Sequence, residues 1–171
     1  MKLTIPDPAL VLLVGPSGAG KSTFARAHFG PTEIVASDAM RQMLSNDPAD
    51  QGASAEAFAL LSILINGRLR RRLMTVVDAT SLRAANRTRY RRLAARYGLP
   101  VVAVAFDLPA RTFHARNRGR DGRVVEDEVV DWQIEQMARA LAAMPSEGYA
   151  ALHVLRDPDT LGLVELVRQP A

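Results

Sequence analysis

A glycine-rich segment near the N-terminus has the residue types and spacing of a loop that binds phosphate groups. Residues 15–22 fit the pattern G-x-x-x-x-G-K-[ST], and they lead into a predicted helix that continues from Thr23 to Phe29. In such loops backbone N–H groups surround the phosphates, the lysine bridges the β and γ phosphates, and the following hydroxyl binds Mg²⁺. The residues predicted to surround a nucleotide are Gly15, Ser17, Gly18, Ala19, Gly20, Lys21, Ser22 and Thr23.

The spacing of these glycines excludes a dinucleotide-binding loop. That loop needs the pattern G-x-G-x-x-G, whereas Gly18 and Gly20 are followed by residues 21–23 with no third glycine. NAD is therefore not expected, and the predicted cofactors are ATP, or another nucleoside triphosphate, and Mg²⁺.

An acidic and a basic residue follow the second predicted strand. That strand ends at Ala36, and a helix that begins directly afterwards brings Asp38 and Arg41 to the same side of its first turn. Ligands of open α/β sheets bind beyond the carboxyl ends of the strands, which puts this pair beside the phosphate loop. Asp38 can then orient or deprotonate an acceptor hydroxyl, and Arg41 can hold an acceptor phosphate. The alternative is that Ser37 or Asp38 only caps the helix.

The third predicted strand also ends on a carboxylate. The segment Val76-Val77-Asp78-Ala79-Thr80 is an apolar run that closes on Asp78, as in strands whose last aspartate supports the Mg²⁺ site of a phosphate loop. Asp78 is therefore predicted to act at the metal ion together with Ser22. A capping role for Asp78 or Thr80 is the alternative.

Arginines gather in residues 109–123, after the fourth predicted strand. Arg116 and Arg120 fall on one helix face if the helix persists through Gly119, and Gly119 and Gly122 are flexible joints. Two guanidinium groups on such a segment can close over the transferring phosphoryl group and neutralise its oxygens. We therefore predict an arginine lid, with a plain solvated basic surface as the alternative.

Alternating strands and helices are predicted to position these residues. Short apolar runs predict strands over Ala9–Val14, Thr32–Ala36, Met74–Val77, Val101–Phe106 and Ala150–Leu155. Helical spacing of apolar residues predicts helices over Leu82–Tyr97 and Val124–Met144. Asp157-Pro158 predicts a last helical turn or two through Val167. Strands separated by helices predict an α/β fold with a parallel sheet.

One long polar loop interrupts this alternation at Ser45–Ser54. Long loops in compact domains are often functional, so we interpret it as a candidate substrate loop. Gln51 within it is the candidate acceptor-binding residue.

The composition is that of one folded domain. The chain has 171 residues, of which 48 % are hydrophobic and 23 % charged, which argues against a disordered, collagen-like or coiled-coil protein. The absence of cysteine excludes a disulfide framework, an iron–sulfur cluster and a thiol nucleophile. The apolar run Ala9–Val14 is too short for a signal segment or a membrane span. We expect a cytoplasmic protein with no membrane contact.

The net charge of +4 conceals a strong asymmetry along the chain. Residues 68–96 contain ten arginines and one acidic residue, and residues 111–123 contain five arginines and one acidic residue. This excess of arginine favours an anionic partner, either phosphate groups or nucleic acid. For residues 68–96 a solvated helix surface is the alternative, because their arginines lie on more than one helix face.

Several of these elements together resemble the 5′-kinase domain of bacterial polynucleotide kinase-phosphatase. They are Met1–Pro6, Gly15–Thr23, Pro31-Thr32-Glu33 leading to Ser37-Asp38 and Arg41, Thr75–Thr80, and the Arg116–Arg123 lid. The resemblance implies a P-loop kinase-like sheet of about five strands in the order 2-3-1-4-5. It also implies that residues 1–171 are one kinase domain, either excised from a larger end-healing protein or free-standing.

The same resemblance implies ATP- and Mg²⁺-dependent phosphorylation of the 5′-OH end of RNA or DNA. Asp38 would be the general base and Arg41 would hold the acceptor phosphate. The groups that act on ATP and Mg²⁺ would be Lys21, Ser22, Arg116 and Arg120, with Asp78 at the metal. The implied partners are nucleic-acid ends and phosphatase and ligase-like domains of the same or another polypeptide, and a homodimer stays open.

Two other function classes remain open from the sequence. A small-molecule P-loop kinase acting on a sugar acid, an antibiotic or a nucleoside would use the same loop, Mg²⁺ site and lid. A nucleotide-gated nucleic-acid-binding module would use the loop and the arginines without chemistry. The arginine clusters favour a polyanionic acceptor.

Overall fold

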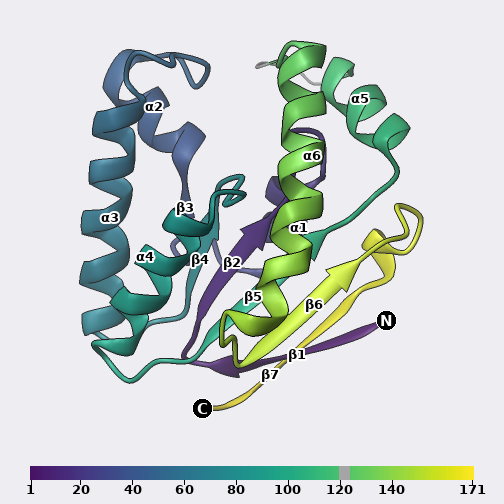
Figure 1. Cartoon of the computed structure of the whole chain (residues 1–171). Helices are drawn as coiled ribbons and strands as arrows, with labels where there is room; N and C mark the ends of the chain where they lie inside the picture. Colours follow the sequence, from purple (N-terminus) through teal and green to yellow (C-terminus); the bar gives the residue numbers. More distant parts are fainter. Residues whose placement is uncertain (120–123) are drawn as a thin grey trace.

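A parallel sheet of five strands forms the centre of the structure, a computed structural model that describes residues 1–119 and 124–171 (Figure 1). The strands are β2 (Leu10–Val14), β3 (Ile34–Ala36), β4 (Thr75–Asp78), β5 (Val101–Phe106) and β6 (Ala151–Leu155). Their spatial order is β3-β4-β2-β5-β6. Numbered along the chain within this sheet, that is the order 2-3-1-4-5, so the implied topology is confirmed.

Helices connect the strands. They are α1 (Lys21–His28), α2 (Ser37–Ser45), α3 (Ser54–Arg70), α4 (Ala84–Ala95), α5 (Ala110–Arg118) and α6 (Asp127–Ala143), followed by the 3₁₀ turn η1 (Met144–Ser146). The two predicted helices are confirmed as α4 and α6 with slightly shorter ends. Within the described residues, no helix combines the length and the apolar character needed to cross a membrane.

The alternation of side chains along β2 divides the interior into two cores. Leu10, Leu12 and Val14 pack with residues of α3, α4 and α6, while Val11 and Leu13 pack with α1 and Phe113 of α5. All five residues of β2 are fully buried. This is the pattern of a central strand covered on both faces, and it fixes the carboxyl end of β2 in the middle of the molecule.

The two ends of the chain form a second, small sheet that the sequence did not predict. β1 (Lys2–Asp7) pairs in parallel with β7 (Glu165–Pro170), and a 3₁₀ turn, η2 (Leu161–Leu163), precedes β7. The predicted helix through Val167 is therefore wrong. Its local pattern could not show that β1, about 160 residues away, offers backbone partners for a strand there.

Candidate active site

The phosphate loop turns between β2 and α1 at the carboxyl end of the central strand. Gly18 and Gly20 have φ angles of 78° and 88°, in the left-handed region that favours glycine. A Cβ atom on Gly18 would lie 2.3 Å from the backbone oxygen of Phe113, so α5 also requires glycine at this position. No side chain caps the start of α1 and its first turn holds no acidic residue, so the positive helix end is available to an anion.

Hydrogen bonds tie this loop to its neighbours. The Lys21 ammonium is buried and donates to the carbonyl oxygens of Gly15, at 2.9 Å, and Pro16, at 2.7 Å. The N–H of Ser17 donates to Oε1 of Gln133 on α6 at 2.7 Å. These contacts hold the lysine inside the curve of the loop, where an anion would sit.

Asp38 and Arg41 lie on the first turn of α2, directly beyond β3. Arg41 is only 4 % exposed, pairs with Asp38, and donates from Nε to the carbonyl oxygen of Pro48 at 2.9 Å. The Asp38 side chain is 39 % exposed. The N-cap of α2 is Ala36 and no side chain caps the helix, so the capping alternative for Ser37 and Asp38 is wrong.

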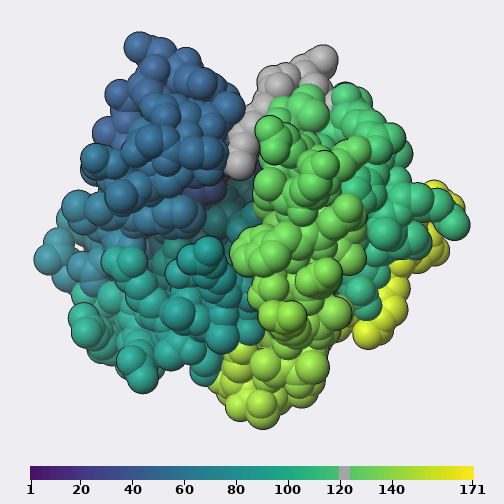
Figure 2. Space-filling model, turned by 45° about the horizontal axis from the view of Figure 1, so that its top comes forward, coloured from purple at the N-terminus to yellow at the C-terminus, as the bar shows by residue number. Residues whose placement is uncertain are grey.

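Two cavities open beside these residues, and they share one wall. A cavity of about 570 Å³ follows the phosphate loop, and one of about 350 Å³ extends toward α3, α4 and α6. We call the cavity along the phosphate loop the donor cavity and the other one the acceptor cavity. The residues that line both are Lys21, Ser22, Asp38 and Asp78. Figure 2 shows the surface hollowed between α2 and α3 on one side and α6 on the other.

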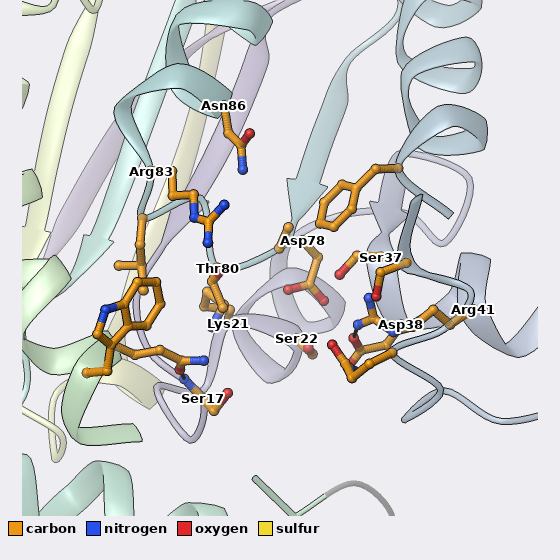
Figure 3. A pocket seen from close by; sticks show the side chains of 17 residues that line it. Ser17, Lys21, Ser22, Ser37, Asp38, Arg41, Asp78, Thr80, Arg83 and Asn86 are labelled. Atoms are coloured by element: carbon orange, nitrogen blue, oxygen red, sulfur yellow. Dashed lines mark hydrogen bonds and ion pairs between the residues drawn. The ribbon is translucent and has the colours of Figure 1, made fainter. Parts of the chain in front are cut away.

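Figure 3 shows how the side chains of the acceptor cavity are arranged. Asp38 and Arg41 of α2 lie on one side, and Arg83 and Asn86 from the start of α4 lie across from them. Ser22 and Asp78 lie between the two groups. The cavity therefore places a carboxylate and guanidinium groups around a space next to the phosphate loop.

The residues predicted for magnesium meet the chemical requirements of that ion. Asp78 ends β4, is 8 % exposed and, like Ser22, lines both cavities. Mg²⁺ in phosphate sites uses one or two protein oxygens and completes its shell with water and phosphate oxygens, which this pair can provide. The N-cap of the following helix, α4, is Arg83 with no side-chain cap, so neither Asp78 nor Thr80 caps it.

Of the predicted lid residues, Arg116 reaches the donor cavity. It lies on α5, lines the cavity with the loop residues Gly18–Thr23, and donates to the carbonyl oxygen of Pro158 at 3.4 Å. α5 ends at Arg118 with Gly119 as its cap, so the helix does not continue through Gly119 as the shared face with Arg120 required. Arg120 lies outside the described residues.

Acidic side chains of α6 hold α5 in place. The two ring nitrogens of His114 lie 3.1 Å from Asp127 and 2.8 Å from Asp131, and Arg118 donates to Asp127 at 2.5 Å. Hydrogen bonding to Asp127 and then Asp131 raises the pKa of His114. The charged contribution of His114 to this attachment is complete below the ordinary pKa of histidine and is lost as pH rises through the raised pKa, whereas the ion pair of Arg118 with Asp127 stays.

Buried charges brace the loop that carries Asp78 into α4. Arg87 is 1 % exposed and donates to both carboxylate oxygens of Glu147, at 3.0 and 2.5 Å. It also donates to the carbonyl oxygens of Ser81, at 3.1 Å, and Leu82, at 2.5 Å. Burial would raise the pKa of Glu147, but hydrogen bonds from Arg87 and Tyr149 lower it below its ordinary value. One arginine of the basic segment 68–96 is therefore structural.

Replacing Arg87 with methionine should lower the free energy of unfolding by about 3 kcal/mol, because it leaves a largely buried carboxylate without its main partner. Urea unfolding measures this loss. The wild-type protein should also lose the contribution of this pair as pH falls through the lowered pKa of Glu147, and keep all of it above the ordinary carboxylate pKa. Arg92→Met, an exposed position on the same helix, should change stability by less than about 0.5 kcal/mol. Equal losses in the two variants would contradict the bracing role.

The sequence model of a family described as AAA domain matches residues 10–144, from β2 to the end of α6. The chain belongs to the AAA domain family. No protein of curated function matches the sequence at a significant level.

Solved structures give this AAA domain protein a more specific fold. A chain of the Pnkp1/Rnl/Hen1 RNA repair complex is 23 % identical with a TM-score of 0.68, over 81 % of this chain and 46 % of that one. A gluconokinase from Sinorhizobium meliloti 1021 is 21 % identical with a TM-score of 0.57, over 93 % and 88 %. The AvrRxo1-ORF1:-ORF2 complex with ATP is 16 % identical with a TM-score of 0.68, over 88 % and 55 %. These likenesses show a P-loop kinase-like fold.

This AAA domain protein brings most of the predicted site residues together, and it adds others. Gln51 lines the acceptor cavity, whereas Gly15 lines neither cavity and its N–H donates to the carbonyl oxygen of Thr80. The residues that the sequence did not single out are Arg26 in the donor cavity and Phe58, Arg83, Asn86, Trp132 and Gln133 in the acceptor cavity. Arg26 could have been found, because it lies four residues after Ser22 on the same helix face.

Trp132 is the more exposed of the two aromatic side chains among these residues. The sequence predicts a core or partly buried residue for both Trp132 and Phe113. Phe113 is in the core, but Trp132 is 44 % exposed and lines the acceptor cavity.

Proposed function

We propose that this chain transfers the γ-phosphate of ATP, or of another nucleoside triphosphate, to the 5′-hydroxyl end of RNA or DNA. The observation that supports this most is the shared wall of the two cavities. Lys21, Ser22, Asp38 and Asp78 line both, so a nucleotide in one cavity and an acceptor in the other would meet there. Proximity and orientation of this kind supply a large part of the catalysis of phosphoryl transfer.

The donor side would bind ATP through charge and backbone N–H groups. Phosphate oxygens would replace the loop carbonyls as partners of the Lys21 ammonium, and the start of α1 would add its N–H groups. Arg26 of α1 and Arg116 of α5 also line this cavity and would lie against the phosphates. Mg²⁺, when bound at Ser22 and Asp78, supplies charge neutralisation on the β and γ phosphates.

The acceptor side would prepare the hydroxyl. The 5′-oxygen attacks the γ-phosphorus, its proton passes to the Asp38 carboxylate, and the bond to the bridging oxygen of the β-phosphate breaks to release ADP. Arg41 would hold the phosphate on the 3′ side of the same nucleotide, with Arg83 across the cavity. A guanidinium is suited to this task because its planar donors match two phosphate oxygens.

Arg41 should therefore distinguish acceptors with a neighbouring phosphate from those without one. A nucleoside 3′-phosphate should be a better acceptor than the nucleoside by about 10- to 150-fold in kcat/KM. This ratio corresponds to the free energy of one hydrogen-bonded contact with a charged group. In Arg41→Leu this ratio should fall toward one, and in Arg70→Leu, an exposed arginine that lines neither cavity, it should not change. A ratio that survives in Arg41→Leu would remove Arg41 from acceptor binding.

A small-molecule kinase is the second candidate. The acceptor cavity of about 350 Å³ would hold a nucleoside or a sugar acid, and the gluconokinase resembles this chain over most of its own length. For that function a 3′-phosphate on the acceptor would bring no advantage, so the same ratio separates the two candidates.

The repair complex also suggests a larger context for this activity. The present chain spans 46 % of the matched chain of the Pnkp1/Rnl/Hen1 RNA repair complex. We propose that residues 1–171 act as the kinase unit beside phosphatase and ligase-like domains. Co-purification of the chain with such activities from its native source would support this arrangement, and isolation of the kinase without either would argue against it.

A further inference from the structure

Trp132 is the single tryptophan of the chain, and core packing does not explain its position. Val130, Ile134 and Met137 form the side of α6 that packs into the interior, as helical spacing requires. Trp132 lies off this stripe and is 44 % exposed. A large part of the aromatic surface of Trp132 thus remains in contact with water. The side chain therefore contributes little to the packing of the core.

The surroundings of Trp132 are those of the acceptor cavity. The indole lines this cavity together with Asp38 and Arg41, and the guanidinium carbon of Arg83 lies 5.9 Å from the centre of the ring. A second aromatic side chain, Phe58, reaches the same cavity from α3. Figure 2 shows α3 and α6 on opposite sides of the hollow, and Phe58 and Trp132 belong to these two helices.

An acceptor with a flat aromatic group would fit these walls better than a sugar acid. Nucleobases stack on exposed aromatic side chains, and each contact of this kind contributes appreciably because every base has a π-face. A sugar acid has no such face and would leave the indole in water. The arginines beside the ring supply the charge that a phosphate backbone needs.

We propose that Trp132 is the stacking platform for the nucleobase of the acceptor's 5′-terminal nucleotide. This proposal rests on the function proposed above and adds a binding site to it. The base is held through its face, with Phe58 as the opposing apolar wall, while Asp38 meets the hydroxyl and Arg41 the phosphate. Stacking tolerates all four bases, so the terminal nucleotide is recognised with little regard to its sequence.

Because the chain has only one tryptophan, its fluorescence reports on this site directly. The experiment titrates the protein with a short single-stranded 5′-OH oligonucleotide and with the same oligonucleotide whose 5′-terminal nucleotide is abasic. The intact oligonucleotide should quench the fluorescence and bind about 5- to 150-fold more tightly than the abasic one. Saturating binding of the intact oligonucleotide without a change in fluorescence would overturn the proposal.

Two variants separate stacking from a structural role of Trp132. With a labelled oligonucleotide and fluorescence anisotropy, Trp132→Leu should bring the affinity ratio of intact to abasic oligonucleotide close to one, and Trp132→Phe should restore most of it. Circular dichroism confirms that both variants are folded. Equal weakening of the two oligonucleotides in Trp132→Leu would show a structural effect only.

The outcome also separates this proposal from the proposed function. If the oligonucleotide accepts phosphate but the base makes no difference to binding, only the stacking platform is wrong. If the oligonucleotide neither binds nor accepts phosphate, the proposed polynucleotide kinase function is wrong, and the proposed stacking platform is wrong as well.

Discussion

Replacing Asp38 with asparagine should lower phosphate transfer by about 10²- to 10⁴-fold, the range that general acid–base catalysis contributes. Asparagine has nearly the shape of aspartate but cannot accept the proton of the acceptor hydroxyl. The affinity for ATP should change little, because the phosphate loop that would bind the nucleotide stays intact. Rapid-quench measurement of single-turnover transfer, with ATP affinity from equilibrium titration, gives both quantities.

The Asp38 variant needs a control for the ion pair that it breaks. Arg41 is 4 % exposed and loses its charged partner in Asp38→Asn, so thermal unfolding should be recorded beside the kinetics. Asp47→Asn makes the same chemical change at an exposed position that lines neither cavity, and it should transfer phosphate at the wild-type rate. Turnover in Asp38→Asn close to that of Asp47→Asn would remove Asp38 from the chemistry.

Replacing Lys21 with methionine should lower the rate of transfer by about 10²- to 10³-fold, the loss seen when one preorganised donor to the transition state is removed. The ammonium is already held in the curve of the loop by the carbonyl oxygens of Gly15 and Pro16. It would exchange these partners for phosphate oxygens without leaving the curve of the loop. Methionine keeps a similar length without the charge, so the loss measures the electrostatic contribution.

The chain offers a matched control for Lys21 because it has only one other lysine. Lys2 is exposed in β1 and lines neither cavity, so Lys2→Met should leave both transfer and ATP affinity at wild-type values. Steady-state kinetics over a range of ATP concentrations compares the two variants. A Lys21→Met protein as active as Lys2→Met would contradict the donor site.

The parts of the site that the sequence predicted are those with short-range patterns. The phosphate loop is a continuous motif, and Asp38 and Arg41 are three residues apart on one helix turn, so local geometry alone places them together. Asp78 could be placed because the carboxyl ends of parallel strands meet at one edge of the sheet.

The parts that were not predicted depend on contacts between distant segments. Arg83, Trp132 and Gln133 reach the acceptor cavity from α4 and α6, and helical periodicity shows which side of a helix is buried but not which exposed residues face a cavity. Arg87 has the sequence appearance of a surface arginine. It is buried because Glu147, 60 residues later, returns to meet it.

The terminal strands are another part of the fold that depends on contacts between distant segments. Leu3 and Ile5 alternate with polar residues and are fully buried, so a strand over Lys2–Asp7 was available from local pattern. Its partner β7 was not, because a short apolar pair such as Leu166-Val167 suits a helix turn as well as a strand. Pairing with β1 decides between them.

The most direct test of the central claim is transfer of labelled γ-phosphate from ATP, with Mg²⁺, to three acceptors measured separately under the same conditions. The acceptors are a short 5′-OH oligonucleotide, a nucleoside without a 3′-phosphate, and gluconate. Our account predicts that kcat/KM for the oligonucleotide exceeds that for either small molecule by about 100-fold, because only the oligonucleotide gives Arg41 a phosphate to bind. Equal rates on oligonucleotide and nucleoside, or transfer to gluconate alone, would contradict the assignment of the acceptor cavity to polynucleotide ends.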